Sequence, residues 1–162
     1  MAPKVGDELP DSTLYEGSPG GAVKIRELFA GKKGVIVGVP GAFTPTCSKT
    51  HLPSYISNFD KLKEAGADVV VTVSVNDPFV MEAWGESLGV GDKVRMLADT
   101  RCEFTKAVDL SFDATPFLGN ERSQRYAMLV VDNVIKAVNV EASPGEATCS
   151  LADPVVELLK AM

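Results

Sequence analysis

The sequence predicts an α/β fold: a mixed central sheet with helices on both of its faces. Two runs, residues 34–39 and 67–75, are rich in β-branched side chains and apolar almost throughout, which is typical of strands buried on both faces of a sheet. A helical pattern separates them, and this order favours parallel pairing. Two further apolar runs flank Asp132 and Asn133, a pair that favours a hairpin and therefore antiparallel strands.

Short elements surround the first of these buried strands. A Gly-rich turn leads into a short strand at residues 22–24 and one helical turn at residues 25–29. A longer helix follows the strand and is expected to stop at Gly66, because glycine commonly ends helices. Its apolar residues recur at steps of four, three and three, which places them on one helical face; they are Leu52, Ile56, Phe59 and Leu62.

The second half of the chain continues the alternation. A helix is expected to begin at the capping residue Asp77 and at Pro78, a favoured pair at helix starts. Its predicted apolar stripe consists of Phe79, Val80, Ala83, Trp84 and Leu88. A strand at residues 93–97 and a short helix at 103–108 come next. The chain closes with a helix whose start carries Ser150 and Asp153 at capping-box spacing.

The composition is that of an ordinary globular protein, and 162 residues fit one domain over positions 1–162. The formal charge is −6, so nucleic acids and anionic membranes are not expected as partners. No secretory signal and no run of roughly 18 apolar residues is found. We expect a cytoplasmic protein, with mitochondrial or peroxisomal targeting left open.

The number and spacing of the cysteines argue against a disulfide framework and against a metal site. Cys47, Cys102 and Cys149 are an odd number without regular spacing, which favours a reducing compartment. One histidine is present, and neither a CxxC nor an HxxxH pair occurs, so no metal site is expected.

Cys47 is the strongest candidate for chemistry. It lies in the stretch PGAFTPTCSKTH, where Thr44 suits the N-cap and Pro45 the first position of a helix. Cys47 then falls in the first turn, where free backbone N–H groups and the helix dipole stabilise a thiolate, the nucleophilic form. The stretch also follows a buried strand, at the edge where α/β sheets bind ligands. The alternative is a cysteine that only fills space beneath the helix.

The residues around Cys47 argue against two common classes of cysteine nucleophile. A thioredoxin-type CxxC is absent, because Thr44 occupies the place of the first cysteine. A cysteine hydrolase would need a histidine base, and His51 lies only one helical turn further on. Hydrolases usually draw that histidine from a distant part of the fold. We therefore expect His51 to make a structural hydrogen bond near the site.

The stretch PGAFTPTCSKTHLP resembles the peroxidatic loop of the peroxiredoxins, in the variety called type II or peroxiredoxin V. The signature places a proline, a threonine and a cysteine at the spacing of Pro40, Thr44 and Cys47. The likeness continues through SVNDPFVMEAWG, VRMLAD and RSQRYAMLVVD and covers nearly the whole chain. It implies a thioredoxin-like fold and a thiol-dependent peroxidase that reduces hydrogen peroxide and alkyl hydroperoxides, with peroxynitrite as a further candidate.

The resemblance also implies the roles of the site residues. Cys47 is the nucleophile, Thr44 and Arg125 contact the thiolate and the peroxide oxygens, and Pro40 shields the thiolate from water. Position alone does not separate Arg125 from Arg122 or Arg95, which are alternatives as the site's cation. We expect Arg125→Ala to lower the rate constant with little loss of stability.

The oxidised product, a Cys47 sulfenic acid, needs a second thiol. The context ATCSLADP resembles the resolving segment of atypical two-cysteine members, which implies an intramolecular disulfide between Cys47 and Cys149 after local unfolding. Plant-like relatives instead carry a cysteine where this chain has Thr72. Cys102 is expected to be a free, partly exposed thiol.

The resemblance further implies thioredoxin, glutaredoxin or glutathione as the reductant, and a homodimer. It also implies that no metal or organic cofactor is required. Two other functions stay open at this point. One is a redox relay that passes oxidation from Cys47 to a client protein, and the other is a non-catalytic adaptor with a thioredoxin-like fold.

Overall fold

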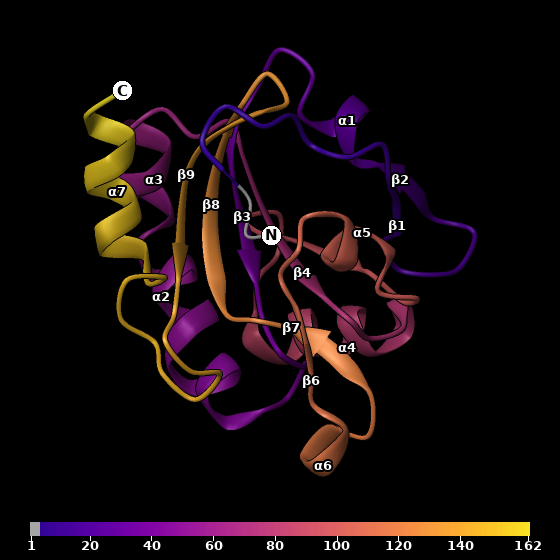
Figure 1. Ribbon diagram of the computed structural model, residues 1–162. Coiled ribbons are helices and arrows are strands. Elements are labelled where there is room, and N and C mark those ends of the chain that lie inside the picture. The colour runs from indigo at the N-terminus through magenta and orange to yellow at the C-terminus, as the bar shows by residue number, and fades with distance from the viewer. Residues whose placement is uncertain (1–3) are drawn as a thin grey trace.

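The computed structural model describes residues 4–162 and has a seven-stranded mixed sheet at its centre (Figure 1). The strand order is β2-β1-β5-β4-β3-β8-β9. The strands are β1 Thr13–Tyr15, β2 Ala22–Lys24, β3 Lys33–Gly38, β4 Val69–Ser74, β5 Arg95–Ala98, β8 Tyr126–Val131 and β9 Val134–Val140. A separate two-stranded sheet pairs β6 Ser111–Asp113 with β7 Glu121–Ser123.

The helices cover the two faces of the large sheet, as predicted. They are α1 Ile25–Leu28, the π-helix η1 Cys47–His51, α2 Leu52–Ser57, α3 Phe59–Glu64, α4 Pro78–Leu88, α5 Glu103–Ala107, α6 Thr115–Leu118 and α7 Ala152–Lys160. One apolar cluster joins the sheet to α2, α3, α4 and α7, and a second joins its other face to α1 and α5. No helix within residues 4–162 is long and apolar enough to span a membrane.

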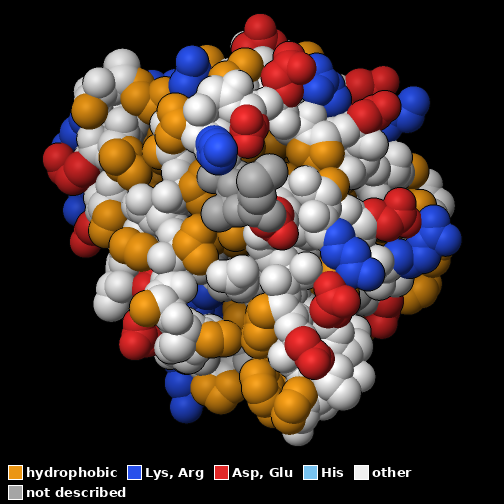
Figure 2. Space-filling view, in the orientation of Figure 1, with side chains coloured by type: hydrophobic (Ala, Val, Ile, Leu, Met, Phe, Trp, Pro, Cys, Tyr) orange, Lys and Arg blue, Asp and Glu red, His pale blue; other side chains and the backbone are white. Residues whose placement is uncertain are grey.

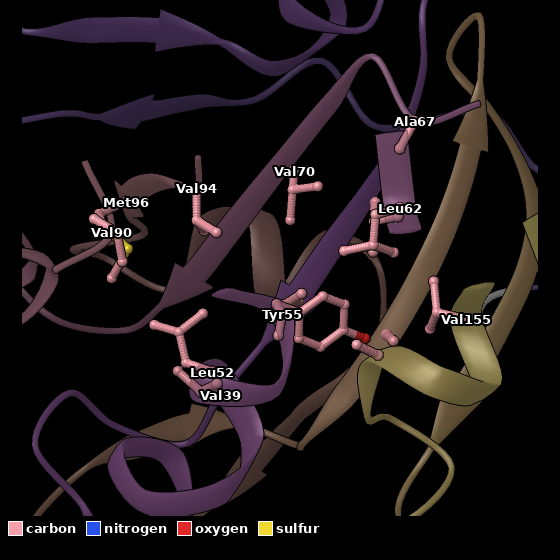
Figure 3. Packing of buried hydrophobic residues seen from close by; sticks show 14 of the residues in the cluster. Val39, Leu52, Tyr55, Leu62, Ala67, Val70, Val90, Val94, Met96 and Val155 are labelled. Carbon is pink, nitrogen blue, oxygen red and sulfur yellow. The ribbon is translucent and has the colours of Figure 1, made fainter. Parts of the chain in front are cut away.

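The strands at the centre alternate their side chains between these two clusters. In β3, Val35 and Val37 pack in the first cluster and Ile36 in the second, and the neighbouring Val70 and Val71 of β4 divide in the same way. Figure 3 shows Val70 facing side chains that come from the helices of the first cluster. Because both faces are covered, these strands are apolar at nearly every position, apart from Lys33 at the start of β3 and Thr72 and Ser74 in β4.

The pairing directions match the prediction. β3 pairs with β4, and β4 with β5, in parallel, whereas β3 with β8 and β8 with β9 are antiparallel. Asp132 and Asn133 both have positive φ, 47° and 67°, as a tight hairpin turn requires. The predicted strand at residues 34–39 is displaced by one residue, and the one at residues 67–75 is shorter at both ends.

The predicted face of the helix after Cys47 is partly wrong. The segment begins with a π-helical stretch and is interrupted at Asn58, where ψ is 17°. Both features shift the phase of the residues that follow. Tyr55 is consequently fully buried, whereas Ile56 and Phe59 are only half-buried.

Helix α4 also turns a different face to the core. Met81, Trp84 and Gly85 are buried, while Phe79 is 61% exposed and Ala83 lies on the surface. A Cβ at position 85 would lie 2.8 Å from Met96 Cγ, so any larger residue there would force the Met96 side chain to shift. The close approach of α4 to β5 at Gly85 sets the rotation of the helix, and a periodicity count that omits glycine misses it.

The predicted capping box of the last helix is wrong. The N-cap of α7 is Leu151, and no side chain of the expected pair caps it. The Ser150 hydroxyl instead donates to Glu141, and the backbone N–H of Ala152 is satisfied by Ser54 Oγ at 3.2 Å. A side chain from another helix has replaced the local cap.

Candidate active site

Cys47 lies where the sequence places it, in the first turn of a helix that follows β3. The chain leaves β3 at Gly38 and turns through a loop, and the Ser48 N–H then donates to the Thr44 carbonyl at 2.9 Å as the first helical hydrogen bond. The Cys47 N–H therefore belongs to the turn whose donors have no partner within the helix. The residue is fully buried.

Arg125 directs its guanidinium at the sulfur. Strand β8 is antiparallel to β3, and Tyr126 pairs with Gly38, so the residue before β8 reaches the end of β3 where the Cys47 loop begins. Arg125 is 2% exposed and donates from Nη2 to Cys47 Sγ at 3.1 Å. Its Nη1 lies 2.9 Å from His51 Nδ1, and its Nε donates to the Pro144 carbonyl at 3.0 Å.

The other two candidate arginines have different partners. Arg95 forms a bidentate pair with Glu16, at 2.8 and 3.0 Å. Arg122 donates to Asn120 and, at 3.3 Å, to the Pro40 carbonyl. Of the three arginines, Arg125 is therefore the one whose hydrogen bond to the sulfur is found among the described residues.

His51 is buried and neutral. Its pKa is lowered from 6.5 to about 3, chiefly by burial and then by the charge of Arg125. Since Nδ1 accepts from Arg125, the network assigns the ring proton to Nε2, which donates to the Ser150 carbonyl at 3.1 Å. The structural hydrogen bond expected of His51 is thus found.

Pro40 and Thr44 border the same loop. Pro40 is buried, and the Thr44 hydroxyl donates to the Gly41 carbonyl at 2.8 Å. Its oxygen keeps lone pairs that can accept. Trp84 lies on the other side of the helix and donates from Nε1 to Ser48 Oγ at 2.9 Å.

The comparisons with known proteins agree with this geometry. The Redoxin family model matches residues 4–155. The chain is 46% identical over 165 residues to Peroxiredoxin-2E-2, chloroplastic, of Oryza sativa subsp. japonica, with 98% of this chain and 72% of that protein covered. It is 42% identical over 163 residues to Peroxiredoxin-2B of Arabidopsis thaliana, covering 98% and 100%.

The chain is a peroxiredoxin. Among solved structures it resembles reduced Prx3 of Vibrio vulnificus in complex with H2O2, with a TM-score of 0.90, 47% identity and coverage of 96% of this chain and 98% of that one. The fold is therefore thioredoxin-like, and the type II resemblance read from the sequence is confirmed. As a peroxiredoxin, the chain is an oxidoreductase: a thiol-dependent peroxidase that uses peroxide substrates and a thiol reductant.

The second thiol of interest in this peroxiredoxin, Cys149, lies in the loop between β9 and α7. Figure 1 shows this loop running beside α2, and Thr46 Oγ1 donates to its Gly145 carbonyl at 3.1 Å. Cys149 is half-buried, its Sγ lies 3.7 Å from the Val140 carbonyl, and it is unbonded to any other cysteine. Its pKa is raised by burial and then by the charge of Glu141.

Cys102 is a free thiol, as expected, but the expected partial exposure is wrong. The residue is 5% exposed and precedes α5, so it is a buried thiol. Burial, followed by the nearby Asp99 carboxylate, raises its pKa to about 11. A thiol held protonated in this way is a poor nucleophile. Its neighbours Thr105 and Phe104 pack into the core around Asp99, a contact that the polar sequence DTRCEF conceals.

Sequence reasoning missed two buried residues that hold the segment around Ser150, beside the site. Tyr55 donates to the Ser150 carbonyl at 2.5 Å, and Glu141 binds Thr148 and Ser150. Glu141 follows β9 directly, and no local motif marks it. No cluster of three or more potential metal ligands is found in residues 4–162.

Proposed function

We propose that Cys47 is the peroxidatic residue of this thiol-dependent peroxidase. The observation that carries the proposal is the 3.1 Å contact from Arg125 Nη2 to Cys47 Sγ inside a buried site. A guanidinium in this place donates to the sulfur and can stabilise negative charge that develops on the peroxide oxygens. The helix start adds the Cys47 N–H as a further donor.

The reaction then proceeds by attack of the Cys47 thiolate on the terminal oxygen of the peroxide. A sulfur–oxygen bond forms while the O–O bond breaks, and the departing oxygen leaves as hydroxide or alkoxide and takes up a proton as water or alcohol. Arg125 stabilises that departing charge, Thr44 accepts a hydrogen bond from the peroxide, and Pro40 limits the access of water. Hydrogen peroxide and alkyl hydroperoxides are the proposed substrates, with peroxynitrite as a further one.

The sulfenic acid on Cys47 is next resolved by Cys149. The Cys149 sulfur attacks the Cys47 sulfur, the S–O bond breaks, and water leaves with the thiol proton. The loop position of Cys149, beside the helix that carries Cys47, supports this route. Thioredoxin, glutaredoxin or glutathione would then reduce the intramolecular disulfide.

We also propose that the peroxidase acts as a homodimer and in the cytoplasm. Two relatives are named chloroplastic, so an organellar location is an alternative. On the face shown in Figure 2, Lys and Arg side chains lie among Asp and Glu side chains in the upper and right-hand parts of the view.

A thiol count tests the proposal directly. The reduced protein receives one equivalent of hydrogen peroxide, and free thiols are counted after seconds. A fall from three thiols to one, with the chain monomeric on a denaturing non-reducing gel, is the expected result. A fall to two means that Cys149 does not resolve Cys47, and no fall refutes the role of Cys47.

A further inference from the structure

The Cys149 loop is held by one buried carboxylate, that of Glu141. Glu141 Oε2 accepts hydrogen bonds from the Thr148 N–H at 2.7 Å, the Ser150 N–H at 2.7 Å and the Ser150 hydroxyl at 2.5 Å. Its Oε1 accepts from the Thr148 hydroxyl at 2.7 Å. The donors belong to Thr148 and Ser150, the residues immediately before and after Cys149. The Glu141 carboxylate therefore holds the backbone on both sides of Cys149.

Glu141 is anchored and ionised. It is 6% exposed, and its backbone N–H donates to the Arg125 carbonyl at 2.9 Å, which ties it to the β8 end of the site. Burial alone would raise the pKa of Glu141, but the hydrogen bonds from Ser150 and Thr148 outweigh it and lower the pKa to about 2. Hydrogen bonds to an ionised acceptor are stronger than neutral ones.

The segment that Glu141 holds, Thr148 to Ser150, also contacts residues of the site around Cys47. The Ser150 carbonyl accepts from His51 and from Tyr55, and His51 in turn accepts from Arg125. Arg125 therefore connects through buried hydrogen bonds to the backbone beside Cys149. Movement of Cys149 toward Cys47 requires these contacts and those of Glu141 to open.

We propose that Glu141 is a positioning residue, a latch that retains the Cys149 segment in the reduced conformation and limits the rate of disulfide formation. The inference rests on the proposed function, because it assumes that Cys149 resolves Cys47. In the wild type, peroxide first makes the Cys47 sulfenic acid. Release of the latch then lets the Cys149 sulfur form the S–S bond, with loss of water. A slow latch leaves the sulfenic acid exposed to a second peroxide, which oxidises it to sulfinic acid.

The test separates the two chemical steps. Trp84 is the one tryptophan of the chain and hydrogen-bonds to Ser48, next to Cys47, so its fluorescence can report both oxidation and loop release in stopped flow. Glu141→Gln keeps the size of the side chain but loses the charge and presents an amide to the donors. We expect the peroxide-independent phase to become about tenfold faster or more, with the peroxide-dependent phase within about threefold.

Two further variants and one product analysis make the result specific. Thr148→Val, which removes one donor to Glu141, should give a smaller acceleration of the same phase and carries the test if Glu141→Gln does not fold. Glu146→Gln changes an exposed carboxylate of the same loop and should leave both phases unchanged. Mass spectrometry should find less sulfinic acid at Cys47 in Glu141→Gln than in the wild type.

The outcomes distinguish the latch from the proposed function. If the wild type forms no disulfide between Cys47 and Cys149, the resolving role itself is wrong, and the latch falls with it. If the wild type forms that disulfide but Glu141→Gln and Thr148→Val form it no faster, the resolving role stands and the latch is refuted.

Discussion

The contact between Arg125 and Cys47 gives the most direct quantitative prediction. Arg125→Lys keeps a positive charge at the site but replaces a planar fork of donors by a single ammonium. The three acceptors of the arginine lie in different directions: Cys47 Sγ at 3.1 Å, His51 Nδ1 at 2.9 Å and the Pro144 carbonyl at 3.0 Å. One ammonium on a flexible chain cannot hold all three in the same geometry.

The expected loss of rate follows from the role of Arg125 Nη2 as a hydrogen-bond donor at the reacting sulfur. Removing one preorganised donor to a developing oxyanion lowers rates by about 100- to 1,000-fold. Arg125→Lys should fall at the lower end of that range, since it keeps the charge, and Arg125→Ala at the upper end. Arg125→Ala also leaves the two buried acceptors, Cys47 Sγ and His51 Nδ1, without this donor. Each lost hydrogen bond costs about 1–3 kcal/mol, so the variant should destabilise the fold by about 2–6 kcal/mol.

The assay is the second-order rate constant for hydrogen peroxide, measured under pseudo-first-order conditions by the fluorescence of Trp84. Urea unfolding gives the stability of each variant, so that loss of rate and loss of fold are separated. Arg95→Lys is the matched control, because Arg95 is paired with Glu16. Rates within threefold of wild type for both Arg125 variants would refute the assignment, and a large effect of Arg95→Lys would show that the assay reads overall stability.

Four other variants test the remaining contacts. Cys47→Ser should abolish turnover, whereas Cys149→Ser should keep one rapid turnover and then stop in the presence of thioredoxin; steady-state and single-turnover assays compare them. Between about pH 7.5 and about pH 5.5 the wild type should lose about 1.4 kcal/mol of unfolding free energy, because the pKa of His51 is about 3 when folded and 6.5 when unfolded, and the unfolded chain binds the extra proton as the pH falls. Urea titrations at both pH values check this, and His51→Gln should remove the difference. Trp84→Phe should cost about 1–3 kcal/mol, since its indole N–H contact to Ser48 is lost in the core; an unchanged urea midpoint would contradict it.

The stability expected of Arg125→Ala illustrates how the structure changes a sequence-based view. An arginine entering a strand is read as surface charge, and its removal then costs little. At 2% exposure and with three acceptors, the same residue becomes part of the protein's internal framework. Its burial depends on the pairing of β8 with β3, which joins positions far apart in the chain.

Local chemistry determined the features that the sequence predicted well. The central strands are continuous apolar runs because both faces of the sheet are covered, and Asp132 and Asn133 adopt the left-handed conformations that a tight hairpin needs. Thr44 and Pro45 start the helix that carries Cys47. Each of these signals lies within a few residues of the feature that it specifies.

Tertiary structure alone decided the rest. It brought the guanidinium of Arg125, which the resemblance had named, to 3.1 Å from Cys47 Sγ and gave Arg95 and Arg122 other partners. It also buried Cys102 and made Glu141 the partner of Ser150 in place of a helix cap. These outcomes depend on strand pairings and helix contacts between segments distant in sequence. A charged or polar residue is exposed or buried according to what the fold brings beside it, and the residue type by itself carries no record of that neighbour.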